Sequence, residues 1–138
     1  MFDSVDEINW LAVLAGTAFY YVLGAVWFTP LFGRAWDRSI GVTRQQGQRY
    51  PPLYYVMPLI SALVVTTATA ALASMLALDA VGDGALLGLL VGCGYAAPVS
   101  LTNAVTPHTP RPLLLGAVTA SYHVTGIAAA AAIVVALS

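Results

Sequence analysis

Four long apolar stretches, separated by short polar segments, dominate the chain. They cover residues from about 8 to 29, 52 to 78, 84 to 105 and 113 to 137. A helix needs about 20 apolar residues to cross a hydrocarbon core about 30 Å thick, so each stretch is long enough to span a membrane. The pattern predicts an all-α membrane protein whose residues 1–138 form a single transmembrane domain, a four-transmembrane-helix bundle.

The connection over residues 31–50 differs from the other two because basic and apolar residues alternate in it at helical spacing. Phe32, Trp36 and Ile40 recur every four residues, with arginines between them. This spacing predicts a short amphipathic surface helix between the first and second spans. The residues expected at the membrane surface are the aromatic anchors and the basic side chains Trp27, Trp36, Arg34, Arg38, Arg44 and Arg49. They set the topology, and such a cluster also attracts anionic headgroups.

Charge is divided between the two ends of the predicted bundle. Every arginine lies in the first or third connection, and every acidic residue except Asp37 lies in the N-terminal segment or the second connection. The positive-inside rule therefore predicts a multi-pass protein of the cell (plasma or inner) membrane with both termini extracytoplasmic. The acidic N-terminus and the length of the apolar run behind it do not fit a signal peptide, so we expect the first helix to be retained.

Composition supports this assignment and excludes several functions. Apolar residues make up 59% of the chain and charged residues 8%, whereas soluble domains carry about 25% charge. No charged residue lies within a predicted span, so the carboxylate used by small proton-coupled exporters is missing. No acid pair, HExxH motif or phosphate-binding loop is present, and Cys93 is the only cysteine. We therefore assign no catalytic residue and no metal ligand, and we expect no nucleic-acid partner; any cofactor is left unknown.

Small residues recur at helical spacing on the predicted spans. Helices in lipid gain little by burying apolar surface against one another, so they associate through small residues that let their backbones approach. The third stretch carries glycine every four residues, which places these glycines on one face. The glycines expected at helix contacts are Gly16, Gly24, Gly84, Gly88, Gly92, Gly116 and Gly126.

His123 lies near the middle of the fourth span, where an ionisable side chain is costly and by default suggests a function. A neutral histidine that is hydrogen-bonded within the bundle remains the structural alternative, and the sequence does not decide between the two. The residues that we expect to line a ligand pocket or pore are Asn9, Tyr20, Tyr95, Asn103, Tyr122 and His123.

The two ends of the first span carry a recognisable signature. Ile8-Asn9-Trp10-Leu11 is followed by Gly24-Ala25-Val26-Trp27-Phe28-Thr29-Pro30-Leu31-Phe32-Gly33-Arg34-Ala35-Trp36, and the pair Tyr122-His123 lies in the last span. These residues resemble DUF1761, a family of small bacterial and fungal membrane proteins of uncharacterised function. The resemblance implies a compact four-helix membrane protein and brings no activity, substrate or cofactor with it.

Three functional hypotheses follow. The leading one is a homo-oligomer in the lipid bilayer that forms a pocket or pore for a lipid or another small hydrophobic or ionic ligand. The second is an accessory subunit that packs against another membrane protein through the Gly84–Gly88–Gly92 seam. The third is an intramembrane enzyme, or a metal or haem protein, centred on His123.

Overall fold

A computed structural model of the chain describes residues 8–138. Asp3, Asp6 and Glu7, on which part of the charge argument rests, lie outside the described residues. Within residues 8–138 all regular structure is helical, and two of the elements, η2 and η3, are π-helical turns. The elements are α1 (Trp10–Val26), η2 (Trp27–Leu31), α2 (Gly33–Ile40), α3 (Leu53–Met75), α4 (Val81–Val91), η3 (Gly92–Ala96), α5 (Ala97–Ala104) and α6 (Pro112–Ala136).

Four continuous helical segments of the described chain are long and apolar enough to cross a membrane. They are Trp10–Leu31, Leu53–Met75, Val81–Ala104 and Pro112–Ala136. This confirms the expected all-α fold with four spans. The third span begins at Val81, earlier than the sequence pattern predicts, so Asp83 lies in the first turn of α4. A carboxylate is favourable there, since the N-terminal end of a helix carries partial positive charge.

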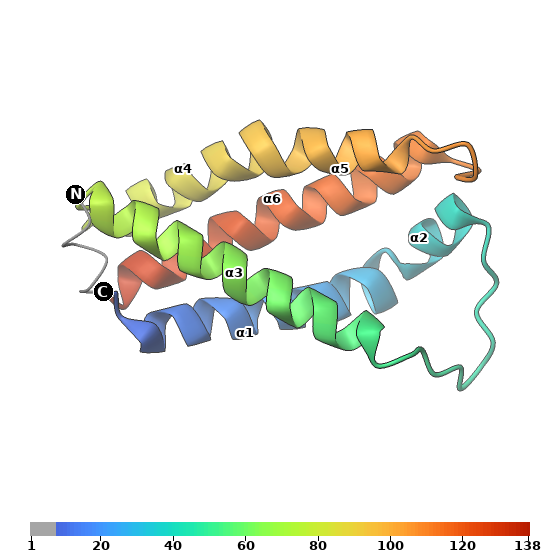
Figure 1. The fold of residues 1–138 in the computed structure, drawn as a ribbon, viewed down its shortest axis with the longest axis horizontal. Coiled ribbons are helices and arrows are strands. Elements are labelled where there is room, and N and C mark those ends of the chain that lie inside the picture. The colour runs from blue at the N-terminus through green and yellow to red at the C-terminus, as the bar shows by residue number, and fades with distance from the viewer. Residues whose placement is uncertain (1–7) are drawn as a thin grey trace.

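The two ends of the described chain are tied together at one end of the bundle. Asn9 caps α1, because its side-chain oxygen accepts hydrogen bonds from the backbone N–H groups of Leu11 and Ala12. Its Nδ2 donates to the carbonyl oxygen of Leu137 at 2.6 Å. Figure 1 shows this end opposite the end that carries α2 and the connection between α5 and α6. The chain therefore crosses the bundle as up-and-down hairpins.

The last helix, α6, is the centre of the bundle. It runs between α1 on one side and the α4–η3–α5 span on the other, and α3 crosses obliquely over it (Figure 1). Half of the most apolar part of α6 is buried, a larger share than in any of the other three described spans. α1 and the third span thus pack mainly on α6, whereas α3 packs on both α1 and α6, and all three leave their outer faces exposed.

In the contact between α1 and α6, a tyrosine of each helix packs against a glycine of the other. The ring of Tyr20 on α1 lies directly over Gly126 on α6, so closely that a methyl group at this position would overlap the ring. One turn further along α1, a Cβ on Gly24 would lie 2.8 Å from the hydroxyl of Tyr122 on α6. Each large ring therefore requires the glycine that faces it.

The glycine seam of the third span faces α6 of the same chain. A Cβ on Gly88 would lie 2.5 Å from the Cα of Ala128, and one on Gly92 would lie 2.9 Å from the Cα of Val124. Gly84 similarly faces the backbone carbonyl of Ala131. This corrects our second hypothesis: the Gly84–Gly88–Gly92 seam is covered within the chain and is not a free surface for another membrane protein.

Only the second half of α3 is packed into the bundle. Its buried residues are the small side chains Ala62, Thr66, Thr69, Ala70 and Ala73. The first turns of α3, residues 53–61, are exposed throughout. Because α3 contacts α1 and α6 but hardly touches the third span, the bundle is open on this side toward the end that carries α2.

The closest backbone contact predicts a stability effect. We expect Gly88→Ala to destabilise the protein by about 1–3 kcal/mol, because the new methyl group meets backbone atoms of α6 that cannot move aside. Thermal unfolding in mild detergent, followed by circular dichroism, measures the effect. Gly94→Ala is the matched control, since nothing lies within 4 Å of a Cβ at Gly94. Equal melting temperatures for the two variants would contradict the packing described here.

Candidate functional site

The first span does not simply end at its proline. Pro30 lies inside η2, where the helix widens to a π-turn and the N–H of Phe32 donates to the carbonyl oxygen of Trp27 at 2.7 Å. Proline cannot donate the usual helical hydrogen bond, so a widened turn accommodates it. Gly33 then starts α2 so close to the first span that a Cβ there would lie 2.9 Å from the carbonyl oxygen of Phe28.

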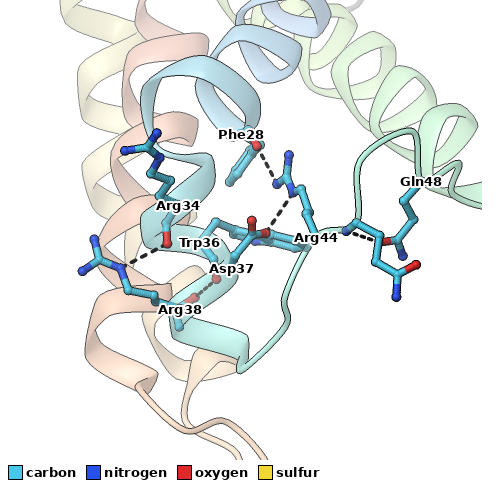
Figure 2. Close-up of polar contacts among 9 residues, drawn as sticks. Phe28, Arg34, Trp36, Asp37, Arg38, Arg44 and Gln48 are labelled. Carbon is cyan, nitrogen blue, oxygen red and sulfur yellow. Dashed lines mark hydrogen bonds and ion pairs between the residues drawn. The ribbon is translucent and has the colours of Figure 1, made fainter.

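Arg44 ties the segment after α2 back to the end of the first span (Figure 2). Its Nε forms an ion pair with Oδ1 of Asp37 at 3.0 Å, and its Nη2 donates to the carbonyl oxygen of Phe28 at 2.9 Å. The guanidinium also lies 5.8 Å from the ring centre of Trp36, a distance at which the charge is attracted to the ring face. Arg44 is therefore a structural cross-link, a role that its position in the sequence did not reveal.

Trp27 is half-buried and bonded to α6. Its Nε1 donates to the carbonyl oxygen of Val118 at 3.1 Å, and its ring packs against Phe32 and Tyr122. Trp36 packs edge-on against Phe28. The two tryptophans at this edge of the bundle thus hold η2 and α2 against the rest of the protein.

The polar centre of the protein is the contact between Tyr20 and His123. The hydroxyl of Tyr20 lies 2.5 Å from Nδ1 of His123, and the two rings meet edge to face. The hydroxyl of the buried Tyr122 donates to the backbone carbonyl oxygen of Tyr20 at 3.2 Å. Tyr20, from a distant part of the sequence, therefore holds the imidazole from the α1 side, and Tyr122 bonds α6 to the backbone of Tyr20.

This contact decides which nitrogen of His123 is available. A hydroxyl of Tyr20 that donates to Nδ1 makes this nitrogen the acceptor and leaves the proton of the neutral ring on Nε2. We assign the hydrogen bond in this sense because Nδ1 of His123 is the one partner of the Tyr20 hydroxyl within residues 8–138, so the phenolic proton has no other acceptor there. The Nε2–H group then remains to donate to something outside the α1–α6 contact.

A groove lies beside His123 between α5 and α6. It has a volume of about 230 Å³ and is lined by Ser100, Asn103, Ala104, Leu115, Thr119 and His123. Asn103 is exposed and His123 is half-buried, so the groove is open on one side. Asn103 precedes the last residue of α5, whereas His123 lies near the middle of α6. The groove therefore leads from the α2 end of the bundle toward the middle of the span.

The structure brings together four of the six residues that we proposed to line a pocket. Tyr20, Tyr122 and His123 are in mutual contact, and Asn103 shares the groove with His123. Asn9 lies at the far end of the bundle as a helix cap. Tyr95 is 74% exposed on the outer face of η3.

Two polar residues of the groove, Ser100 and Thr119, were not among our candidates. Each stands one helical turn from a residue that was, since Ser100 precedes Asn103 by three positions and Thr119 precedes His123 by four. This spacing was the available signal. Within residues 8–138, no group of three or more His, Cys, Asp or Glu side chains lies together as a metal site would require.

The model of a family described as "Protein of unknown function (DUF1761)" matches residues 11–135. The chain belongs to the DUF1761 family. No curated protein and no solved structure matches it.

The structure gives a physical reason for the residues that carried the resemblance to DUF1761. Gly24 makes room for the ring of Tyr122, and Trp27 donates to α6. Gly33 permits the tight turn into α2, and Trp36 lies beneath Arg44. In this DUF1761 protein the part of the signature from Gly24 to Trp36 therefore lies along one region of contact among α1, η2, α2 and α6.

Removing the Tyr20 hydroxyl tests the assigned state of His123. We expect Tyr20→Phe to leave Nδ1 without its donor, which changes the nitrogen-15 shift of Nδ1 and weakens the preference for the tautomer with its proton on Nε2. Nitrogen-15 NMR of histidine-labelled protein measures the tautomer. His108, which is exposed in the connection between α5 and α6, is the internal control. Unchanged His123 signals would contradict the hydrogen bond.

Removing the Arg44 cross-link tests the junction at the end of the first span. We expect Arg44→Gln to cost about 1–3 kcal/mol of stability, because Asp37 loses its ion pair and a charged hydrogen bond to Phe28 is lost. Arg49→Gln removes the same charge from an exposed position and should leave the melting temperature unchanged. An equal loss of stability in both variants would show that the effect comes from net charge and not from the cross-link.

Proposed function

We propose that this protein binds the polar group of a lipid or another small amphiphile in the groove between α5 and α6. The observation that carries the proposal is that the half-buried His123 contacts the Tyr20 hydroxyl through Nδ1 and also lines a polar groove. An ionisable residue within a span is costly, so it suggests a function when it is not fully enclosed by the bundle.

The groove offers neutral hydrogen-bonding groups of both kinds. The amide of Asn103 and the hydroxyl of Ser100 can donate and accept, and Nε2–H of His123 can donate. A hydroxyl, carbonyl or phosphate group of a ligand would complement this set. Leu115 in the groove and the exposed Leu101 on α5 supply apolar surface for the remainder of an amphiphile.

The depth of the groove favours a ligand that enters from the membrane edge. A helix rises about 1.5 Å per residue, so His123 lies roughly 16 Å from the start of α6, about halfway across a hydrocarbon core about 30 Å thick. A bound molecule could keep one end near the interface while its polar group reaches the imidazole. The open side of the groove provides the lateral entry.

The orientation and assembly of the protein belong to the same proposal. We infer a position in the cell membrane with both termini extracytoplasmic, which is supported by the arginines of α2 at the end opposite Asn9 and Leu137. We further infer a homo-oligomer, because polar side chains in an open groove would otherwise meet lipid. A second copy would close the groove over its ligand.

The test is native mass spectrometry of the full chain released from mild detergent. We expect the wild type to retain a small molecule that His123→Ala and Asn103→Ala lose, because each variant removes a hydrogen-bonding group from the groove. Ser121→Ala is the matched control: its hydroxyl donates to Ala117 of the same helix and its side chain is exposed outside the groove.

The same spectra separate the parts of the proposal. A wild-type protein that never carries a small molecule, after purification or after incubation with a lipid extract, would overturn the ligand proposal. If both variants retain the ligand, the binding site does not lie at His123. A protein that is monomeric with its ligand bound would refute the homo-oligomer alone.

A further inference from the structure

A second concave site lies at the membrane edge, separate from the His123 groove. It has a volume of about 520 Å³, and α2 and the segment that follows it line it with Arg34, Asp37, Arg38, Val42, Thr43 and Arg44. Three of these six side chains are basic and one is acidic. The proposed ligand groove and this basin share no residue.

The three arginines of the basin differ in what they contact. Arg44 is already engaged by Asp37 and by the carbonyl oxygen of Phe28. Arg34 and Arg38 are exposed, and within residues 8–138 neither forms an ion pair with a carboxylate. Nε of Arg38 donates to the carbonyl oxygen of Arg34 at 3.2 Å, which holds its stem along α2. Figure 2 shows both guanidinium groups extending to the same side of the helix, away from Arg44.

This arrangement is unfavourable for the helix itself. Arg34 is the second residue of α2, and a cation at a helix N-terminus is opposed by the partial positive charge of that end. Arg34 and Arg38 are also four residues apart, where two like charges repel each other across one helical turn. The ion pair of Asp37 is directed to Arg44 and does not relieve the repulsion. An anion held between Arg34 and Arg38 would offset both costs.

The height of the basin in the membrane identifies the class of anion. The first span ends at Leu31, and α2 begins at Gly33, so the basin lies at the level of the lipid headgroups. Guanidinium groups match phosphate oxygens with pairs of parallel hydrogen bonds, and the hydroxyl of Thr43 can add another donor. We propose that Arg34 and Arg38 bind the phosphate of an anionic phospholipid in this basin, with Arg44 as a positioning residue.

The experiment titrates the full chain in mild detergent with short-chain phosphatidylglycerol or phosphatidylcholine, and native mass spectrometry counts the bound lipid. We expect phosphatidylglycerol to bind at least tenfold more tightly than phosphatidylcholine. Arg34→Gln and Arg38→Gln should each weaken phosphatidylglycerol binding about fivefold, because each removes one basic group near the headgroup. Binding of phosphatidylcholine should not change.

Arg49→Gln is the matched control, since Arg49 is an exposed arginine of the same connection that does not line the basin. It should bind phosphatidylglycerol like the wild type. An equal loss in Arg49→Gln would overturn the proposal in favour of diffuse attraction by net charge. Equal binding of the two lipids would also overturn it, as would saturable binding of inorganic phosphate at these arginines without any preference for phosphatidylglycerol. Melting temperatures of the variants verify that each is folded, and either arginine variant alone can carry the test.

Discussion

The close approach of α6 to the helices on either side of it is the constraint on which the rest of the structure depends. In lipid, apolar surface supplies little attraction between helices, so contact at short range must supply it. Glycines of α1 and of the third span allow this contact: Gly24 faces the ring of Tyr122, and Gly88 faces the backbone at Ala128. Because α6 packs closely against helices on two sides, these contacts set its register relative to both of them.

The candidate site is a consequence of that register. Tyr20 lies over Gly126, and this placement carries its hydroxyl to Nδ1 of His123 three residues earlier on α6. The groove forms on the other side of the imidazole, where α5 packs on the first half of α6 and contributes Asn103. Packing and chemistry thus share the same residues, since Tyr20, which fills space between the helices, also orients His123 in the middle of α6.

At the membrane edge charged interactions hold the structure together, because water and headgroups replace hydrocarbon there. Charged groups can be used there, and Arg44 joins the end of the first span, α2 and the following segment through an ion pair, a backbone hydrogen bond and an aromatic ring. This leaves Arg34 and Arg38 as exposed cations on α2. The helix α2 is itself fixed to the start of α6, because the N–H of Arg111 donates to the carbonyl oxygen of the buried Ser39. A fixed pair of cations can recognise a particular anion, whereas a mobile basic loop would attract anions in general.

The sequence by itself determined the spans, the surface helix and the family, because the length of an apolar run and the spacing of aromatic and basic residues are local properties. It also indicated which glycines lie on helix contacts, but not which helix each one meets, so the seam of the third span could be taken for a free surface. Only the tertiary structure decided that Asn9 is a cap joined to Leu137, that Trp27 bonds to Val118, and that Tyr20 holds His123. Each of these pairs is separated by most of the chain, and their meeting depends on how antiparallel helices align when small residues let them touch.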